Sequence, residues 1–157
     1  GCSIPESPDI SHEIVDSANS LDSGTAEGQS FDSGSGGQIA KVCIAVTFSD
    51  GTSTLTMRIG PDPDLSDVGG TYLEEFSFGA VTETGWACVE SSTNPSLSAS
   101  TTYYLGVMLT GTGTDWTWDR DSNAGYANGE RLGADSGWSL GDEVSTTDET
   151  FRIYYCD

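Results

Sequence analysis

Apolar and polar side chains alternate over short stretches along much of the chain. The alternation is clearest where Tyr103, Leu105, Val107 and Leu109 occupy every second position. A repeat of two residues is typical of a β-strand that buries one face, because successive side chains point to opposite sides. We therefore predict a core strand over residues 103–109 and expect it to lie centrally in its sheet.

The residues that follow predict a hairpin that carries two tryptophans. Gly111–Asp115 has the small and polar composition of a turn, and Trp116 and Trp118 come next on a second short strand. Their spacing places both indoles on one side of that strand. Two interpretations stay open. The indoles fill the core, which is the commoner position of a tryptophan, or they form a flat surface for a ligand.

Similar alternation over residues 39–48, 55–59 and 151–155 predicts further strands, separated by turn residues at intervals of about ten positions. No stretch has the period of about 3.6 residues that marks an amphipathic helix. Residues 119–141 show neither pattern and are interpreted as a long loop. About eight to ten short strands predict an all-β fold, an antiparallel β-sandwich that is jelly-roll-like.

The chain of 157 residues fits a single domain. We place the sandwich at residues 28–157 and treat residues 1–27 as a polar N-terminal arm with one strand-like segment, ISHEIV. The arm has too few apolar side chains for a core of its own. Either it forms an edge strand of its own sandwich, or it donates Ile10, Ile14 and Val15 to the sheet of a neighbouring copy.

Four cysteines, Cys2, Cys43, Cys88 and Cys156, lack the close spacing of a zinc site and predict two disulfides. Of the three possible connectivities we favour Cys2 with Cys156 and Cys43 with Cys88. The first pair would hold together two chain ends that otherwise fray. Disulfides persist in oxidising environments, so we expect an extracellular or cell-surface location.

Charge excludes some classes of partner. The chain has 25 acidic and five basic residues and a formal net charge of −20. A surface of this sign repels phosphate backbones and anionic lipids, and no run approaches the roughly 20 apolar residues of a membrane span. We expect neither nucleic-acid binding nor membrane insertion. Divalent cations are better partners, although solubility in a salty environment explains the acidity equally well.

One acidic segment has the spacing of a calcium-binding loop. Asp119, Asp121, Asn123 and Glu130 occupy its first, third, fifth and twelfth positions, where oxygen ligands converge on the ion. The turn glycine comes one position late, and no helices flank the segment. A polar turn accounts for the same residues, and calcium is the competing expectation.

Aromatic side chains near the same segment suggest a carbohydrate site. Sugar-binding surfaces combine aromatic faces with amides and carboxylates that bind hydroxyl groups. Trp116, Trp118, Tyr126 and Trp138 could supply the faces, and Asn128 an amide. The alternative for each ring is burial in the core or over an open end of the sandwich.

Catalysis is not expected. A nucleophile–base pair requires a histidine or a reactive cysteine. The only histidine, His12, lies in the N-terminal arm, where we expect a solvated strand residue, and the cysteines are expected to be bonded. No carboxylate pair stands in a sequence neighbourhood that is apolar enough to raise a pKa. We therefore interpret the chain as non-enzymatic.

Several short segments mark strand ends and turns: Gln29–Phe31, Thr101–Leu105, Tyr126–Gly129, Ser136–Trp138 and Phe151–Tyr154. In this order they resemble a widespread group of secreted bacterial and archaeal jelly-roll modules, which occur beside anchors, adhesin repeats, hydrolases and phage tail proteins. These modules are mostly uncharacterised or carbohydrate-binding-like. The resemblance covers about residues 28 to 155 and implies a non-catalytic extracellular role. The arm and the cysteines lie outside it.

Two functions are compatible with these patterns. We favour a secreted structural module that associates with copies of itself in an extracellular filament or cell-surface assembly. The disulfides, the arm without a core and the open-edged sandwich favour it. The alternative is a carbohydrate-binding module with a glycan partner.

Overall fold

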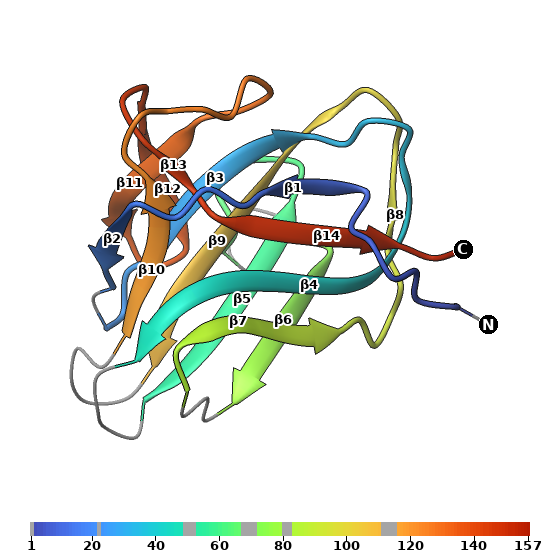
Figure 1. Cartoon of the computed structure of the whole chain (residues 1–157), viewed down its shortest axis with the longest axis horizontal. Helices are drawn as coiled ribbons and strands as arrows, with labels where there is room; N and C mark the ends of the chain where they lie inside the picture. Colours follow the sequence, from blue (N-terminus) through green and yellow to red (C-terminus); the bar gives the residue numbers. More distant parts are fainter. Residues whose placement is uncertain (1, 22, 49–52, 67–71, 80–82, 111–115) are drawn as a thin grey trace.

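A computed structural model describes residues 2–21, 23–48, 53–66, 72–79, 83–110 and 116–157 (Figure 1). All regular elements in this part of the chain are β-strands, and it contains no helix that could cross a membrane. The strands are β1 (Ile10–His12), β2 (Ser17–Ser20), β3 (Glu27–Asp32), β4 (Gly37–Phe48), β5 (Thr54–Gly60), β6 (Glu74–Gly79), β7 (Gly85–Glu90), β8 (Ser96–Leu97), β9 (Thr102–Thr110), β10 (Trp116–Asp121), β11 (Arg131–Ser136), β12 (Ser139–Val144), β13 (Asp148–Glu149) and β14 (Phe151–Tyr155).

The strands form two antiparallel sheets of eight and six strands, which we call the larger and the smaller sheet. The larger sheet contains the neighbour order β1-β14-β4-β7, and the smaller sheet contains β3-β9-β5-β6. Followed along the chain, these strands pass between the sheets in the order of a jelly roll. The predicted all-β sandwich is confirmed.

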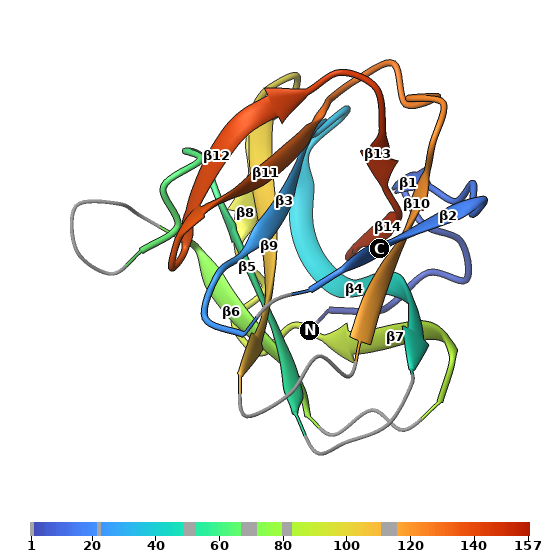
Figure 2. The same ribbon diagram turned by 90° about the vertical axis from the view of Figure 1, so that its left-hand side faces the viewer.

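The connection between β9 and β14 is long and contains four further strands, β10 to β13, which extend both sheets; we call this segment the insertion. β10 pairs with β4, β2 and β13 in the larger sheet. β11 pairs with β3 and β12, which lengthens the smaller sheet (Figure 2). The interpretation of residues 119–141 as a long loop is therefore wrong. β11 buries only Leu132 and exposes its last three residues, so it leaves no apolar repeat in the sequence.

The structure has more strands than the eight to ten that the sequence predicts. Four of the fourteen are short, since β1 and β2 have 3 and 4 residues and β8 and β13 have 2 each. Such short strands cannot show a repeat of two.

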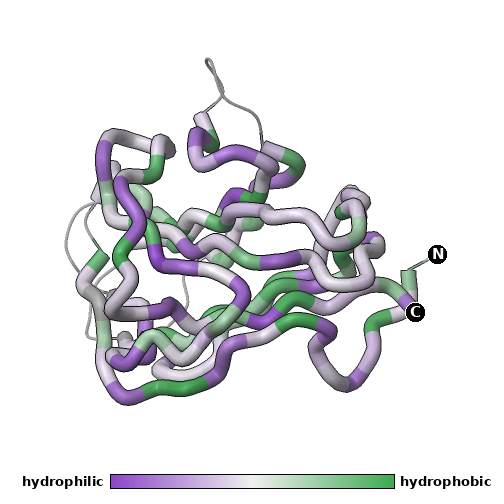
Figure 3. Tube along the Cα trace, turned by 90° about the horizontal axis from the view of Figure 1, so that it is seen from above, coloured by the Kyte–Doolittle hydropathy of each residue, from purple (hydrophilic) through white to green (hydrophobic). Residues whose placement is uncertain are grey.

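The main core lies between the sheets, and the alternation that predicts it is visible along the chain in Figure 3. Tyr103, Leu105, Val107 and Leu109 all belong to it. Their strand, β9, lies between β3 and β5, which confirms the predicted central position. The turn predicted at Gly111–Asp115 lies outside the described residues.

Each sheet also has a smaller apolar cluster apart from the main core. On the smaller sheet it contains Ala26, Leu65, Met108, Leu132 and Leu140. On the larger sheet Ala40, Cys43 and Tyr154 are packed against Cys2, Ile4, Trp86 and Cys156. Met108 and Cys43 alternate with core residues of their strands, which places these clusters on the outward faces. Cys43 therefore lies outside the main core.

Both predicted disulfides are present. Cys43 and Cys88 lie directly opposite each other on β4 and β7, with their Cα atoms 4.1 Å apart. Cys2 and Cys156 join the two ends of the chain, which lie near each other in Figure 1.

The N-terminal arm lies in its own sandwich. Ile10 packs against the main core, and β1 pairs with β14 of the same chain. In this single copy β1 is therefore an edge strand of its own sandwich, and donation to a neighbouring copy stays a prediction. Ile14 and Val15, which strand donation would bury, are 52% and 49% exposed.

Candidate functional site

The predicted aromatic surface does not form. Trp118 is completely buried in the main core, where its indole Nε1 donates a hydrogen bond to the carbonyl oxygen of Thr150 at 2.8 Å. A ring in this position cannot contact a sugar, so its assignment to a ligand site is wrong. The first interpretation, a core tryptophan, holds for Trp118. The side chain of Trp116 lies outside the described part of the structure.

Tyr126 and Trp138 are half-buried in separate places. The Tyr126 ring packs edge-on against Phe151 of the main core, with centroids 5.3 Å apart. Trp138 belongs to the outward cluster of the smaller sheet and stacks on the guanidinium of Arg58, 4.4 Å from its ring centroid. The two rings therefore do not share one surface. Asn128 is exposed and lines a cavity described below.

Side chains of the predicted calcium loop form hydrogen bonds with the protein itself. Asp119 accepts a hydrogen bond from the Thr47 hydroxyl at 2.8 Å, and burial raises its pKa against the effect of that bond. The Asn123 amide donates to Asp16 at 3.2 Å. In the described residues, no three His, Cys, Asp or Glu side chains gather as metal ligands. Calcium at this loop stays a prediction, and the contacts are those of a polar turn.

Asp121 forms a buried pair with a residue that the sequence places in solvent. His12 is only 7% exposed, and its Nε2 lies 3.0 Å from Oδ2 of Asp121. Asp121 also accepts hydrogen bonds from the backbone N–H groups of Asn123 and Gly125, both at 2.9 Å. Burial favours a higher pKa for Asp121, but these bonds outweigh it and hold the pKa below its usual value. The expectation of a solvated His12 is wrong, because the insertion covers it.

A cavity of about 380 Å³ lies on the outward face of the smaller sheet. Its floor is formed by Ser30 of β3 and by Thr102 and Tyr104 of β9. Its walls are formed by the loop before β11 and by one residue of β12. The complete lining is Ser30, Thr102, Tyr104, Ala127, Asn128, Gly129, Glu130 and Glu143.

Hydrogen bonds fix the loop wall of this cavity to β3. The backbone N–H of Ser30 donates to the carbonyl oxygen of Glu130, and the backbone N–H of Glu130 donates to the Ser30 hydroxyl, both at 2.8 Å. A Cβ atom on Gly129 would lie 1.9 Å from the Ser30 carbonyl oxygen. Only glycine therefore permits this close approach, and the wall is held before any ligand binds.

Two carboxyl groups face each other in the cavity. A hydrogen bond with Glu143, and then repulsion by its charge, raise the pKa of Glu130. Glu130 therefore keeps its proton to a higher pH than an isolated glutamate does. Together with Asn128 and the Tyr104 hydroxyl, the site offers several acceptors and donors beside one aromatic ring.

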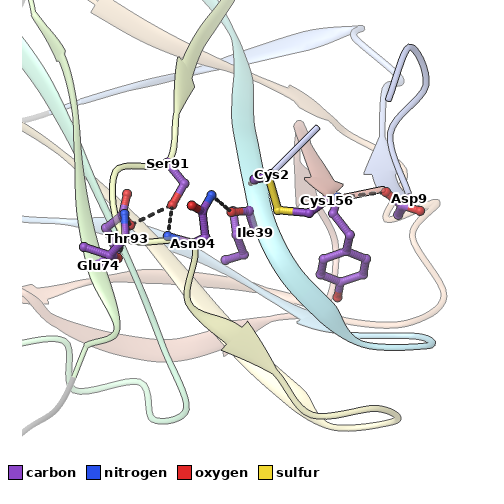
Figure 4. The surroundings of a disulfide bond; sticks show 9 residues. Cys2, Asp9, Ile39, Glu74, Ser91, Thr93, Asn94 and Cys156 are labelled. Carbon is purple, nitrogen blue, oxygen red and sulfur yellow. Dashed lines mark hydrogen bonds between the residues drawn. A yellow bond between two sulfur atoms is a disulfide. The ribbon is translucent and has the colours of Figure 1, made fainter. Parts of the chain in front are cut away.

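A second cavity, of about 260 Å³, lies beside the Cys2–Cys156 disulfide (Figure 4). It is lined by Cys2, Ile4, Ala40, Glu90, Ser91 and Asn94. The turn on its far side is held by Glu74 of β6, which accepts hydrogen bonds from the Ser91 hydroxyl at 2.7 Å and from the Thr93 N–H at 2.9 Å. Burial opposes the charge of Glu74, but its hydrogen bonds lower the pKa. This carboxylate is a structural anchor.

An ionic cluster lies in the interior where the insertion meets β3. Arg131 Nε lies 3.0 Å from Glu149 Oε1, and Arg131 Nη2 lies 3.2 Å from Glu27 Oε2. Gln29 accepts from the Glu149 N–H at 2.8 Å and donates to Asp148 at 3.1 Å. Burial raises the pKa of Glu149 well above its usual range, although Arg131 acts in the opposite direction. No sequence pattern marks this cluster, because its members come from distant segments of the chain.

No family model, no curated protein and no solved structure matches the chain. The jelly roll is therefore assigned from strand order and pairing alone. Since one fold supports many functions, function has to be argued from the two cavities and the sheet edges.

Proposed function

We propose that this protein is a secreted, non-catalytic module that binds carbohydrate in the cavity beside Tyr104. The observation that carries the proposal is the composition of that cavity, in which one aromatic ring, an exposed amide and two carboxyl groups line a volume of about 380 Å³. The two disulfides support the extracellular part of the proposal, because such bonds persist in oxidising compartments.

The chemistry of the lining suits a sugar. A pyranose has an apolar face that packs on an aromatic ring and hydroxyl groups that bond to amides and carboxylates. The wall formed by Gly129 and Glu130 is already fixed to Ser30, so little ordering opposes binding. The net charge of −20 opposes phosphate-rich ligands but not neutral glycans.

Binding to an array of neutral and amino-sugar oligosaccharides tests this proposal. Asn128→Ala and Glu143→Gln alter exposed side chains of the cavity, and each should weaken binding roughly tenfold, the value of about one lost hydrogen bond. Glu90→Gln is the matched control, because Glu90 is exposed and lines the other cavity. Equal binding by all variants, or no binding to any glycan, would contradict the proposal.

A second candidate function is a subunit of an extracellular filament or cell-surface assembly built from copies of this chain. It is favoured by one observation: the edge of the larger sheet beside β14 is closed by only the three residues of β1. An edge covered by so short a strand is a site where another chain can pair. Negative-stain imaging and light scattering of the oxidised protein test it, and monodisperse single copies at every concentration would contradict it.

A further inference from the structure

The strand β1 is the outermost strand on the β14 side of the larger sheet. Its three residues, Ile10–His12, pair with Phe151–Ile153 of β14. Residues 13–15, which follow it, form no regular structure, and the chain then continues into β2 on β10. Residues 2–13, to which the name arm is restricted from here on, are therefore a short segment joined to the rest of the sandwich by an irregular connection.

The arm makes many of its contacts with a single partner segment, β14 and the two residues after it. The contacts outside β1 are Cys2 with Cys156, Ser3 O with Asp157 N at 2.9 Å, Asp9 N with Ile153 O at 2.9 Å, Asp9 Oδ2 with Tyr155 N at 2.8 Å, and Glu13 with Arg152. A segment that recognises one continuous edge in this way can recognise the same edge on another copy, because the chemistry is identical.

The connection after β1 carries the two most exposed large apolar side chains of the described chain, Ile14 and Val15, at 52% and 49% exposure. In one isolated copy they face water. If the connection instead crossed from one copy to the next, both side chains would lie at the junction between the copies, where contact with the neighbour can bury them. Their position therefore favours a connection that spans two copies.

We propose that the arm is exchanged between copies, so that residues 2–13 of one chain occupy the β14 edge of a second chain and Cys2 bonds to Cys156 of that chain. The inference rests on the second candidate function and is independent of the glycan cavity. Formation of the bond removes two protons and two electrons from the thiols. A disulfide oxidant of the compartment accepts the electrons and is itself reduced to two thiols. Exchange thus links copies covalently with the same contacts that close a single copy.

Mixing two full-length variants tests the exchange. Cys156→Ser keeps a donor arm with Cys2, and Cys2→Ser keeps an acceptor edge with Cys156, while both retain the Cys43–Cys88 bond. The variants carry distinguishable masses and are oxidised together at high concentration with glutathione disulfide. We expect a covalent heterodimer at least tenfold more abundant than either homodimer, with a Cys2–Cys156 peptide in its mass map. A heterodimer no more abundant than the two homodimers together would overturn the proposal, because random pairing of the thiols at equal concentration gives that result.

Ile10→Pro provides the matched control, because proline removes a backbone donor from β1. In the Cys156→Ser copy it impairs the donor arm and should reduce the heterodimer to the level of random pairing. In the Cys2→Ser copy it loosens the arm that covers the acceptor edge and should increase the heterodimer. If Ile10→Pro lowers the amount of heterodimer equally in either copy, the substitution acts through a general folding defect, and the proposal is overturned. Assemblies of wild-type protein in electron micrographs, without a preferred heterodimer, would keep the assembly function and reject arm exchange.

Discussion

His12 Nε2 and Asp121 Oδ2 lie 3.0 Å apart although 109 positions separate the two residues in the chain. Asp121 also accepts two backbone hydrogen bonds, from Asn123 and Gly125, so one carboxylate ties the start of the insertion to β1. Asp121→Ala removes all three bonds. We expect it to lower the free energy of unfolding by about 2 to 3 kcal/mol in urea titrations, since buried donors lose their acceptor. Ser122→Ala, at the exposed neighbour, should change stability by less than about 0.5 kcal/mol.

Gly129→Ala should damage the cavity directly. Its new Cβ would lie 1.9 Å from the Ser30 carbonyl oxygen, so the loop has to move away from β3. We expect a loss of about 1 to 3 kcal/mol of stability and the loss of any glycan binding. Gly133→Ala is the matched control, because the nearest atom to its Cβ would be 3.9 Å away. Similar melting temperatures and binding for the two variants would refute the role assigned to Gly129.

The stability of the fold should depend on pH in two opposite ways. The pKa of Glu149 is raised well above its ordinary value of 4.5, so the folded chain binds more protons than the unfolded chain between 4.5 and the raised pKa. Its contribution to stability is therefore lost as the pH rises through that window. The pKa values of Glu74 and Asp121 are lowered, and their contributions are lost as the pH falls through those lowered values.

Urea unfolding from pH 3 to pH 8 measures both effects. We expect a maximum of stability in mildly acid solution, with a decrease on each side. Glu149→Gln should flatten the decrease toward neutral pH and leave the acid side unchanged. Glu90→Gln, an exposed control, should leave both sides as they are. A curve for Glu149→Gln that is parallel to the wild-type curve would argue against a buried proton on Glu149.

The bond between Cys43 and Cys88 closes a segment with a sequence separation of 45 residues. Replacing both cysteines by alanine restores the freedom of that segment in the unfolded chain. We expect a decrease of about 3 to 4 kcal/mol in the free energy of unfolding, measured by chemical denaturation. The Cys2–Cys156 bond should still form in this variant, which mapping of disulfide peptides checks. An unchanged denaturation midpoint would show that the sandwich does not depend on the Cys43–Cys88 bond.

The parts of the fold that could be predicted are those with a local signature. Apolar side chains occupy every second position from Tyr103 to Leu109, because one face of this strand packs against the core. The four cysteines stand on strands or at the chain ends, and these positions predict both disulfides. Trp118 was ambiguous for a physical reason, because an indole is apolar enough for the core and flat enough for a ligand.

The cavity and the buried pairs could not be predicted because they join distant segments. The cavity collects Ser30, Tyr104, Asn128 and Glu143 from separate strands and a loop. The sequence marks only Asn128 and Glu130 of its lining as site residues, and it places Glu130 in a calcium loop. Ile10 and Ile14 lie two positions before and after His12, but the atoms that cover His12 come from the insertion, which the sequence does not place beside it. No repeat of two or 3.6 residues reports contacts of this kind.

Most of the five basic side chains of this chain lie against aromatic rings or carboxylates of the fold. Four of them stack on rings or pair inside the fold: Lys41 over Tyr154, Arg58 between Tyr72 and Trp138, Arg152 over Trp86, and Arg131 between Glu27 and Glu149. Water therefore meets a surface that behaves as a polyanion, and copies repel one another across a Debye length of about 10 Å at 0.1 M salt. Added salt shortens that range, so any association between copies should strengthen as ionic strength rises, opposite to the behaviour of complexes held by complementary charges.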